Sequence, residues 1–339
     1  MIHVGILGAG NISQTHARAA HAIPGVEITA VLGRTREKAE SFAKEYGAAA
    51  YDDLAKFVAH KPMDLVAIGS PSGVHAEQAI AAVERGLHVL VEKPVDITTE
   101  RIDKLIAAAD RARVKVGVFF QDRLKPDIVR LKQLVDSGTL GKPVLASARV
   151  KWYRPPDYYG QSRWRGTWAL DGGGALMNQG IHTVDVMQWL MGPVVRLSAR
   201  TATLLHKIEV EDTAVATIEF SSGALGILEA TTSVYPGYPR RVEVTGSEGT
   251  AILDGDTLIS LELRNAPPSE TKEGGPTISS SSPVVADASA HQRIVEDFIA
   301  AIQNNRDPVC DARAGRKSVA LVEAIYASAR EHGAPYVLR

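Results

Sequence analysis

The chain has 339 residues, a formal net charge of −1, 45% hydrophobic and 23% charged residues. This length predicts two domains, and the composition excludes a disordered, collagen-like or disulfide-stapled chain. The near-neutral charge without a basic block argues against nucleic acid or an anionic membrane as partner. Its single cysteine, Cys310, has no intrachain disulfide partner. Because we recognise no signal peptide and no membrane-spanning apolar run, we expect a cytoplasmic protein.

Short apolar strands alternate with helices over the first 120 residues. The strands are expected to end near Gly8, Gly33, Gly69, Glu92 and Phe120. The helices between them are expected at Ile12–Ala22, Arg36–Tyr46, Val74–Arg85 and Glu100–Arg111. This alternation is typical of a parallel sheet with helices on both faces, so residues 1–121 are expected to form a doubly wound, Rossmann-type domain.

The pattern changes after Gln121. Mostly strand-like segments follow: Val144–Trp152, Leu197–Leu204, Thr213–Phe220, Ala224–Ser233, Arg241–Thr245 and Thr250–Asp254. Helices are expected at Asp127–Asp136, Ala175–Met191, Ala290–Gln303 and Ala312–His332, and a long surface loop at Arg264–Ser289. Since few helices separate the strands, residues 122–339 are expected to form an α+β domain with an antiparallel or mixed sheet. Its C-terminal helices either stay in this domain or pack back on the first one.

The first strand runs into a glycine-rich turn, Gly8-Ala9-Gly10-Asn11-Ile12-Ser13, which opens a helix. Gly8 permits a tight turn, and Gly10 lets the backbone approach a pyrophosphate at the helix N-terminus. Ser13 replaces the third glycine of the fingerprint by another small residue. The alternative is a generic tight turn, but its position at the start of the series favours a dinucleotide site.

The end of the second strand bears on the choice between NAD and NADP. It reads Gly33-Arg34-Thr35, with no acidic residue to bind the ribose 2′-hydroxyl; Glu27 lies at the strand's beginning. Gly33 leaves space, Arg34 is suited to a phosphate, and Thr35 is suited to capping the next helix. We expect NADP, with NAD as the other possibility, although Arg34 facing solvent or stacking on adenine stays open.

Further cofactor contacts are expected from the carboxyl edge of this sheet. Ser70 and Pro71 follow one strand, and His75 either lies near the nicotinamide or caps a helix. Gln121 closes the last strand. Glu92 and Lys93, which precede Pro94, stand at the edge where ligands bind in such sheets and are expected to contact the cofactor.

Four motifs occur together in order: Gly8-Ala9-Gly10, Ser70-Pro71-Ser72 with His75, Glu92-Lys93-Pro94, and the stretch from Asp171 through Gly172-Gly173-Gly174 and Asn178 to His182 and Asp185. With this set the chain resembles the glucose–fructose oxidoreductase, inositol dehydrogenase and rhizopine-catabolism (Gfo/Idh/MocA) family over essentially its full length. The resemblance implies a Rossmann domain followed by a substrate and oligomerisation domain with an open, mainly antiparallel sheet. It also implies a cofactor between the domains and a homodimer or homotetramer.

The resemblance further implies residue roles. The lysine matching Lys93 contacts substrate and nicotinamide ribose, and the histidine matching His182 is the acid–base residue. Several sugar and inositol dehydrogenases carry aspartate where this chain has Asn178, whereas a branch acting on nucleotide-linked N-acetyl amino sugar uronates carries asparagine. Since an amide cannot take up a proton, a mechanism that needs a carboxylate there is in doubt.

In a helix, Asn178, His182 and Asp185 share one face. We expect His182 to take the hydroxyl proton, Lys93 to stabilise the alkoxide and Asn178 to orient a sugar. Asp185 is expected to hold His182 or the helix, or to contact substrate. The glycines before this helix permit a ligand approach or a sharp turn. No metal site is expected, because the ligand spacing is absent.

A second group is rich in aromatic and basic residues: Trp152, Arg154, Tyr159, Arg165 and Trp168. Aromatic rings stack on sugars and arginines bind carboxylate or phosphate, which suits a uronate or nucleotide sugar. Packing between domains or subunits explains the same composition equally well.

The sequence therefore predicts an NAD(P)-dependent dehydrogenase that acts on a hydroxyl-bearing carbon of a sugar-like small molecule. Two other functions stay open. One is an NAD-dependent glycosidase acting by transient oxidation, and the other is a non-catalytic dinucleotide or sugar sensor, against which both Lys93 and His182 argue. The substrate itself is not predicted, because a fold does not fix a function.

Overall fold

The computed structural model describes residues 1–160, 162–266 and 288–338. By their internal contacts these residues form two units. The first comprises Met1–Gln121 and the described part of Val284–Arg316; the second comprises the described parts of Asp122–Pro283 and Lys317–Arg339. Each unit has its own sheet. The division into a dinucleotide-binding domain at 1–121 and a substrate domain at 122–339 remains a prediction, because contacts alone do not assign a function.

The first unit is built on a six-stranded parallel sheet in the order β3-β2-β1-β4-β5-β6. Its strands are β1 (Ile2–Leu7), β2 (Val26–Leu32), β3 (Ala49–Tyr51), β4 (Leu65–Ile68), β5 (His88–Val91) and β6 (Val116–Val118). This order is that of a doubly wound dinucleotide-binding fold. β4 is buried throughout, as expected for a strand with helices on both faces of the sheet.

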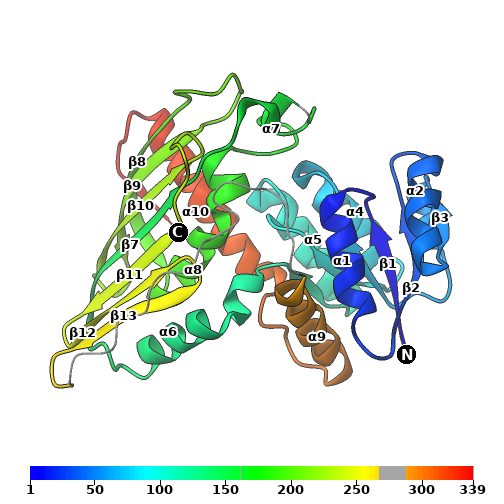
Figure 1. Ribbon diagram of the computed structural model, residues 1–339, viewed down its shortest axis with the longest axis horizontal. Helices are drawn as coiled ribbons and strands as arrows, with labels where there is room; N and C mark the ends of the chain where they lie inside the picture. The colour runs from blue at the N-terminus through cyan, green and yellow to red at the C-terminus, as the bar shows by residue number, and fades with distance from the viewer. Residues whose placement is uncertain (161, 267–287, 339) are drawn as a thin grey trace. The chain divides into compact units, whose positions relative to one another are not determined.

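Helices cover this sheet (Figure 1). They are α1 (Asn11–His21), α2 (Arg36–Ala43), α3 (Leu54–Val58), α4 (His75–Val83), α5 (Thr99–Ala112) and α9 (Ser289–Gln303). α9 comes from the far end of the chain and packs beside α1. Gly117 of β6 admits it closely, since a Cβ there would lie 2.8 Å from the Phe298 ring.

The second unit is built on an eight-stranded sheet in the order β13-β12-β11-β7-β10-β9-β8-β14. Its strands are β7 (Pro143–Lys151), β8 (Val194–Ala202), β9 (Thr213–Phe220), β10 (Leu225–Thr231), β11 (Arg241–Gly246), β12 (Gly249–Asp254), β13 (Thr257–Leu263) and β14 (Tyr336–Val337). Only the β7–β10 pair is parallel among these described strands. Burial alternates along β9 and β10, so one face is covered and the other is open.

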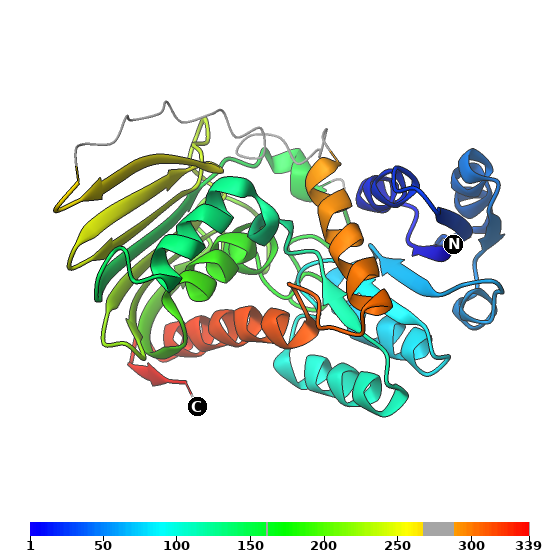
Figure 2. The same cartoon turned by 90° about the horizontal axis from the view of Figure 1, so that it is seen from below.

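Helices of the second unit lie against the covered face (Figure 2). They are α6 (Pro126–Asp136), a π-helix (Ala175–Gly180), α8 (Ile181–Met191) and α10 (Ala312–Arg330), with the short α7 (Pro156–Gly160) after β7. α8 packs on β7, and the π-helix packs on β9 and β10. The segment carrying Asn178 and His182 is therefore fixed on a rigid sheet.

The predicted fold class is confirmed: a doubly wound parallel sheet is followed by a mainly antiparallel one. The single helix predicted at Ala175–Met191 is wrong in detail, because its first turn is a π-helix. The loop predicted at Arg264–Ser289 lies largely outside the described residues. None of the described helices is long and apolar enough to cross a membrane.

Candidate active site

The glycine turn after β1 has the geometry of an anion site. Gly8 has φ +111°, and a Cβ there would lie 2.5 Å from Ser13 Oγ, so only glycine fits. Gly10 is the N-cap of α1 and makes no side-chain cap, so the N–H groups of Asn11 and Ile12 face outward from the first turn. Apart from its own chain neighbours, no described residue comes within 4 Å of a Cβ built on Gly10. That space and those donors fit a pyrophosphate.

The end of β2 is arranged differently from the prediction. On the side where a side chain would stand, Gly33 packs against α2, because a Cβ there would lie 2.9 Å from the Ala39 backbone nitrogen. Thr35 caps α2 as predicted, accepting from Lys38 N. Arg34 is exposed, and no ion pair to it occurs among the described residues. Arg34 is thus the cation at this strand end that is available to a ligand.

His75 joins two loops at the carboxyl edge of the first sheet. Its Nδ1 lies 2.8 Å from the Pro94 carbonyl oxygen and its Nε2 lies 2.9 Å from the Ser70 carbonyl oxygen. The ring is 1% exposed. Ser70 Oγ donates to Gln78, and Pro71 begins a short 3₁₀ turn. The histidine therefore holds this edge in shape.

Gln121, the last residue of the first unit, has a buried side-chain oxygen with no hydrogen-bond partner in the described part of the chain. Such an atom normally finds a partner, so it is suited to a bound group. Together with the open space at Gly10, it makes the first unit fit a dinucleotide. The residues that would hold it are those of the glycine turn, Arg34 and Gln121.

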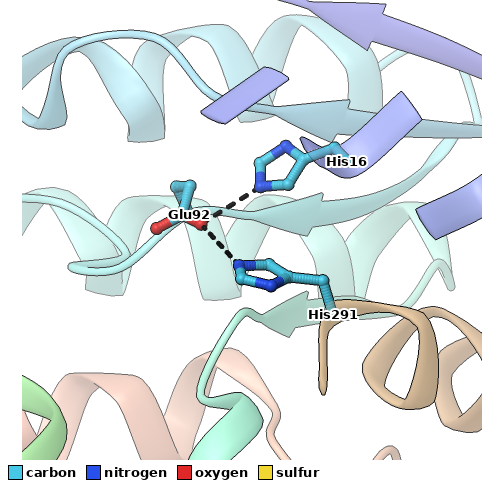
Figure 3. A group of neighbouring side chains, drawn as sticks. All are labelled: His16, Glu92 and His291. Carbon is cyan, nitrogen blue, oxygen red and sulfur yellow. Dashed lines mark hydrogen bonds and ion pairs between the residues drawn. The ribbon is translucent and has the colours of Figure 1, made fainter. Parts of the chain in front are cut away.

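Glu92 and Lys93 follow β5 directly. Glu92 Oε1 lies 3.1 Å from His16 Nε2 and 3.9 Å from His291 Nε2 (Figure 3). Its Oε2 accepts from the Lys93 backbone N–H at 2.9 Å. Burial alone would raise the pKa of Glu92, but the hydrogen bond and charge of His16, with the charges of Lys93 and His291, lower it to about 2. This cluster was not predicted from the sequence, because its members are far apart in the chain.

These three side chains are also near enough to one another to hold a metal ion. His16 Nδ1, however, is buried without a hydrogen-bond partner in the described residues. A ligating histidine almost always donates its second nitrogen to a partner that orients it. The donor set therefore fits a hydrogen-bonded ion cluster better than a metal centre, and the expectation of no metal site remains a prediction.

In the second unit, Asn178 lies in the π-helix and is fixed by its neighbours. Its Nδ2 donates to Asp171, and its Oδ1 accepts from Gln179 at 2.6 Å. Asp171 also accepts from Gly166 N. Position 178 thus carries an amide where several relatives in the family carry a carboxylate, and this amide is hydrogen-bonded to the carboxylate of Asp171.

His182 begins the first turn of α8 and faces Asp122. Its Nδ1 lies 3.7 Å from Asp122 Oδ2, and its side chain is 15% exposed. Asp122 is buried and pairs with Arg240 and with Lys125. Burial raises the pKa of Asp122, but Arg240, Lys125 and His182 hold it well below its usual value. A fixed anion therefore stands beside the imidazole.

Asp122 was not predicted from the sequence, and for Asp185 three roles were left open: holding His182, holding the helix or contacting substrate. Asp185 is 1% exposed and accepts from Arg123 Nε at 2.8 Å and from Ser318 Oγ at 3.0 Å. Its carboxylate is thus engaged in joining η3 (Gln121–Leu124), α8 and α10. This favours a structural role for Asp185 over substrate binding.

The glycines before the π-helix pack against the protein itself. A Cβ on Gly174 would overlap the Glu211 backbone oxygen, and one on Gly173 would overlap Tyr326 Oη. Glu211 accepts from Gly174 N and Leu176 N. Burial raises the pKa of Glu211 from 4.5 to about 7 despite these hydrogen bonds. Gly173 and Gly174 are therefore needed for close packing where the chain enters the π-helix.

The aromatic and basic segment divides into a buried and a partly exposed part. Trp152 and Arg154 are buried, with the Arg154 guanidinium 5.0 Å from the Trp152 ring. Tyr159 hydrogen-bonds to Thr232, and burial raises its pKa. Trp168 is 45% exposed. Packing therefore explains Trp152, Arg154 and Tyr159. Arg165 and Trp168 remain candidates for substrate binding.

Arg165 lies over two aromatic rings, 4.4 Å from the Tyr158 centroid and 5.4 Å from the Trp164 centroid. It forms no ion pair with any described carboxylate. A guanidinium held over aromatic rings is preorganised for an anionic group.

A glycine turn at the head of a 3-2-1-4-5-6 parallel sheet, followed by a unit with a partly exposed histidine beside a buried carboxylate, is the arrangement expected of a nicotinamide-dependent oxidoreductase. Comparison with known proteins agrees. Residues 2–120 match the oxidoreductase family with an NAD-binding Rossmann fold, and residues 128–252 match the GFO/IDH/MocA C-terminal domain. The chain belongs to this family, and the prediction of a dehydrogenase is confirmed at that level.

Three similar proteins illustrate how much of the chain its relatives match. An uncharacterised oxidoreductase, YrbE of Bacillus subtilis, is 31% identical over 277 residues, covering 78% of this chain and 77% of that protein. D-apiose dehydrogenase of Paraburkholderia graminis is 28% identical over 331 residues, covering 96% and 87%. The WlbA dehydrogenase of Bordetella pertussis, solved with NADH and UDP-GlcNAcA, is 30% identical with a TM-score of 0.89, covering 100% and 99%.

Proposed function

We propose that this protein is an NAD(P)-dependent dehydrogenase that transfers hydride between the nicotinamide and a hydroxyl-bearing carbon of a sugar, polyol, uronate or nucleotide sugar. The observation that carries the proposal is the His182–Asp122 pair, in which a partly exposed imidazole lies 3.7 Å from a buried carboxylate. Family membership supplies the reaction class.

His182 takes the proton of the substrate hydroxyl as the carbon is oxidised and returns it in reduction. Asp122 stabilises the imidazolium that forms, because its charge is fixed by Arg240 and Lys125. A bound nicotinamide supplies the hydride acceptor. Asp122 is thus the carboxylate that we assign to His182, whereas Asp185 holds the helix, one of the roles that the sequence left open.

Lys93 contributes an ammonium, which stabilises a developing alkoxide. Asn178 orients the sugar with an amide already fixed by Asp171 and Gln179. Both roles come from the family resemblance and from the chemistry of the side chains.

A uronate or nucleotide-linked sugar is the first substrate class to test. The WlbA relative was solved with UDP-GlcNAcA, and Arg165 offers a stacked guanidinium to an anionic group. Neutral sugars and polyols come next, since other relatives are named D-apiose dehydrogenase and myo-inositol 2-dehydrogenase.

NADP remains our preferred cofactor because Arg34 is exposed after β2 and has no described ion pair. The WlbA relative binds NADH, so NAD is the alternative.

A homo-oligomer through the open face of the second sheet completes the proposal. Val215, Leu225, Ile227 and Leu145 are between 40% and 58% exposed on this face. Adjacent apolar side chains on an open sheet favour association. Light scattering of Leu225→Lys with Ile227→Lys should give a smaller particle than the wild type, and Val309→Lys, exposed in the first unit, should not.

The deciding experiment is a spectrophotometric screen at 340 nm with NAD and NADP against UDP-linked uronates, free uronates, aldoses and inositols. Reduced cofactor formed in proportion to substrate supports a dehydrogenase. Sugar release without reduced cofactor indicates a glycosidase instead, and binding of both ligands without turnover indicates a sensor.

A further inference from the structure

Glu92 is a buried carboxylate placed next to Lys93 in the chain. Its side chain is 9% exposed, yet it carries a charge. A buried anion costs several kcal/mol unless donors surround it. The donors here are His16 Nε2 and the Lys93 backbone N–H, with His291 Nε2 at 3.9 Å.

The two histidines come from helices that are remote in sequence. His16 lies on α1 and His291 on α9, and their side chains are 0% and 3% exposed. His16 also stacks on Phe119 at 4.0 Å with an angle of 6° (Figure 3 shows the three polar side chains converging). α1, β5 and α9 are thus joined at one carboxylate.

The two oxygens of Glu92 have different tasks. Oε1 faces the histidines, and Oε2 holds the backbone N–H of Lys93. The Lys93 charge in turn lowers the pKa of Glu92, so the two charges interact. Movement of this carboxylate would move the start of the lysine side chain.

We propose that Glu92, anchored by His16 and His291, is a positioning residue that fixes the backbone of Lys93 and supplies a negative charge that acts on its ammonium. The proposal rests on the role given to Lys93 in the proposed function. In this arrangement α9, although about 200 residues away, contributes to the reactivity of the lysine.

The first test needs no substrate. Lysines of the full-length protein are reductively methylated with ¹³C-formaldehyde, and the Lys93 signal is assigned by its absence in Lys93→Arg. The groups facing Glu92 are His16, His291 and Lys93. Because removal of a nearby anion disfavours an ammonium, Glu92→Gln should shift the Lys93 titration midpoint about 0.5–1 pH unit lower.

The matched control is Glu100→Gln, an exposed carboxylate paired with Lys104 in the same unit. It should leave the Lys93 midpoint unchanged. An unchanged midpoint in Glu92→Gln as well would overturn the electrostatic half of the proposal.

The second test uses the best substrate from the screen. Glu92→Asp keeps the charge but withdraws the carboxylate by one methylene, so its midpoint should stay near the wild-type value while kcat falls about tenfold. Its KM for the cofactor should change little. Wild-type kcat in Glu92→Asp contradicts the positioning half. This variant also serves if Glu92→Gln does not fold, as checked by circular dichroism.

Different results would contradict this inference and the proposed function. Full activity in Lys93→Ala removes the role of the lysine, whereas an inactive Lys93→Ala with unaffected Glu92 variants removes only the cluster's role. Elemental analysis gives one more outcome: a stoichiometric metal in the wild type that is lost in His291→Gln would identify a metal centre and overturn the proposal.

Discussion

Two glycine-rich turns precede helices in this protein, one in each unit, and the surroundings of their glycines differ. Around Gly10, no described residue apart from its chain neighbours comes within 4 Å of the position that a Cβ would take. Around Gly173 and Gly174, the space is already filled by Tyr326 and Glu211. The space beside the first turn is open to a ligand, whereas the second turn needs its glycines for the chain's own packing.

The comparison teaches that glycine content alone does not identify a ligand site. What distinguishes the two turns is whether the neighbouring space is open or occupied. The open turn presents uncapped N–H groups of α1, and the filled turn delivers Asn178 and His182 at a fixed place on the sheet. We propose that the first region binds the cofactor and that the second supports the residues that carry the chemistry.

The largest effect is expected from the region that carries the chemistry. His182→Ala should lower kcat about 1,000-fold, since a general acid–base group contributes about 10²–10⁴. The dissociation constant for the cofactor should stay within about threefold. Steady-state kinetics and fluorescence titration measure the two quantities. His21→Gln, an exposed histidine of the first unit, is the control, and comparable kcat for both variants would remove His182 from the mechanism.

The two glycine turns can be set against each other directly. Gly174→Ala should lower the free energy of unfolding by about 3 kcal/mol, because the added methyl overlaps a backbone oxygen. Gly10→Ala should leave the unfolding midpoint without cofactor unchanged and weaken cofactor binding about tenfold. Denaturant titration and calorimetry give both values. Equal stability losses in the two variants would abolish the distinction.

The sequence predicts the first region better than the second for a physical reason. The turn at Gly8 and Gly10 is local, and its backbone demands are visible in consecutive residues. The pairs His182–Asp122 and Asp185–Arg123 join residues about 60 positions apart, and no periodic pattern encodes them. Family resemblance supplied His182, but only the packed structure shows which carboxylate faces it.

The π-helix and Gly33 illustrate the same limit. The apolar pattern of Ala175–Met191 does predict a helix, but the wider first turn depends on the Glu211 contacts at Gly174 and Leu176. Gly33 is needed for helix packing against Ala39, which the strand's own sequence does not reveal. Sheet order and element types follow from local pattern, whereas the partners of single side chains do not.

Glu211 gives the filled turn a dependence on pH. Its pKa is raised from 4.5 to about 7 by burial, so the folded protein holds a proton that the unfolded chain releases. The resulting stability is full below about pH 4.5 and is lost as the pH rises through 7, by about 3 kcal/mol. Unfolding curves between about pH 5 and 8 should show this loss, and Glu211→Gln should flatten it. An equally steep loss in the variant would mean that another group titrates.

The smallest expected effect concerns which cofactor, NADP or NAD, the first unit prefers. Arg34→Ala should raise KM for NADP about tenfold and leave KM for NAD nearly unchanged, because a guanidinium–phosphate pair is a charge-assisted, bidentate contact. Arg36→Ala removes the same charge two residues on, where the side chain already pairs with Glu40 at 2.7 Å. Only the first variant should change the ratio of kcat/KM for the two cofactors. A constant ratio in both would leave Gly10 and α1 as the binding surface but transfer the choice of cofactor to residues other than Arg34.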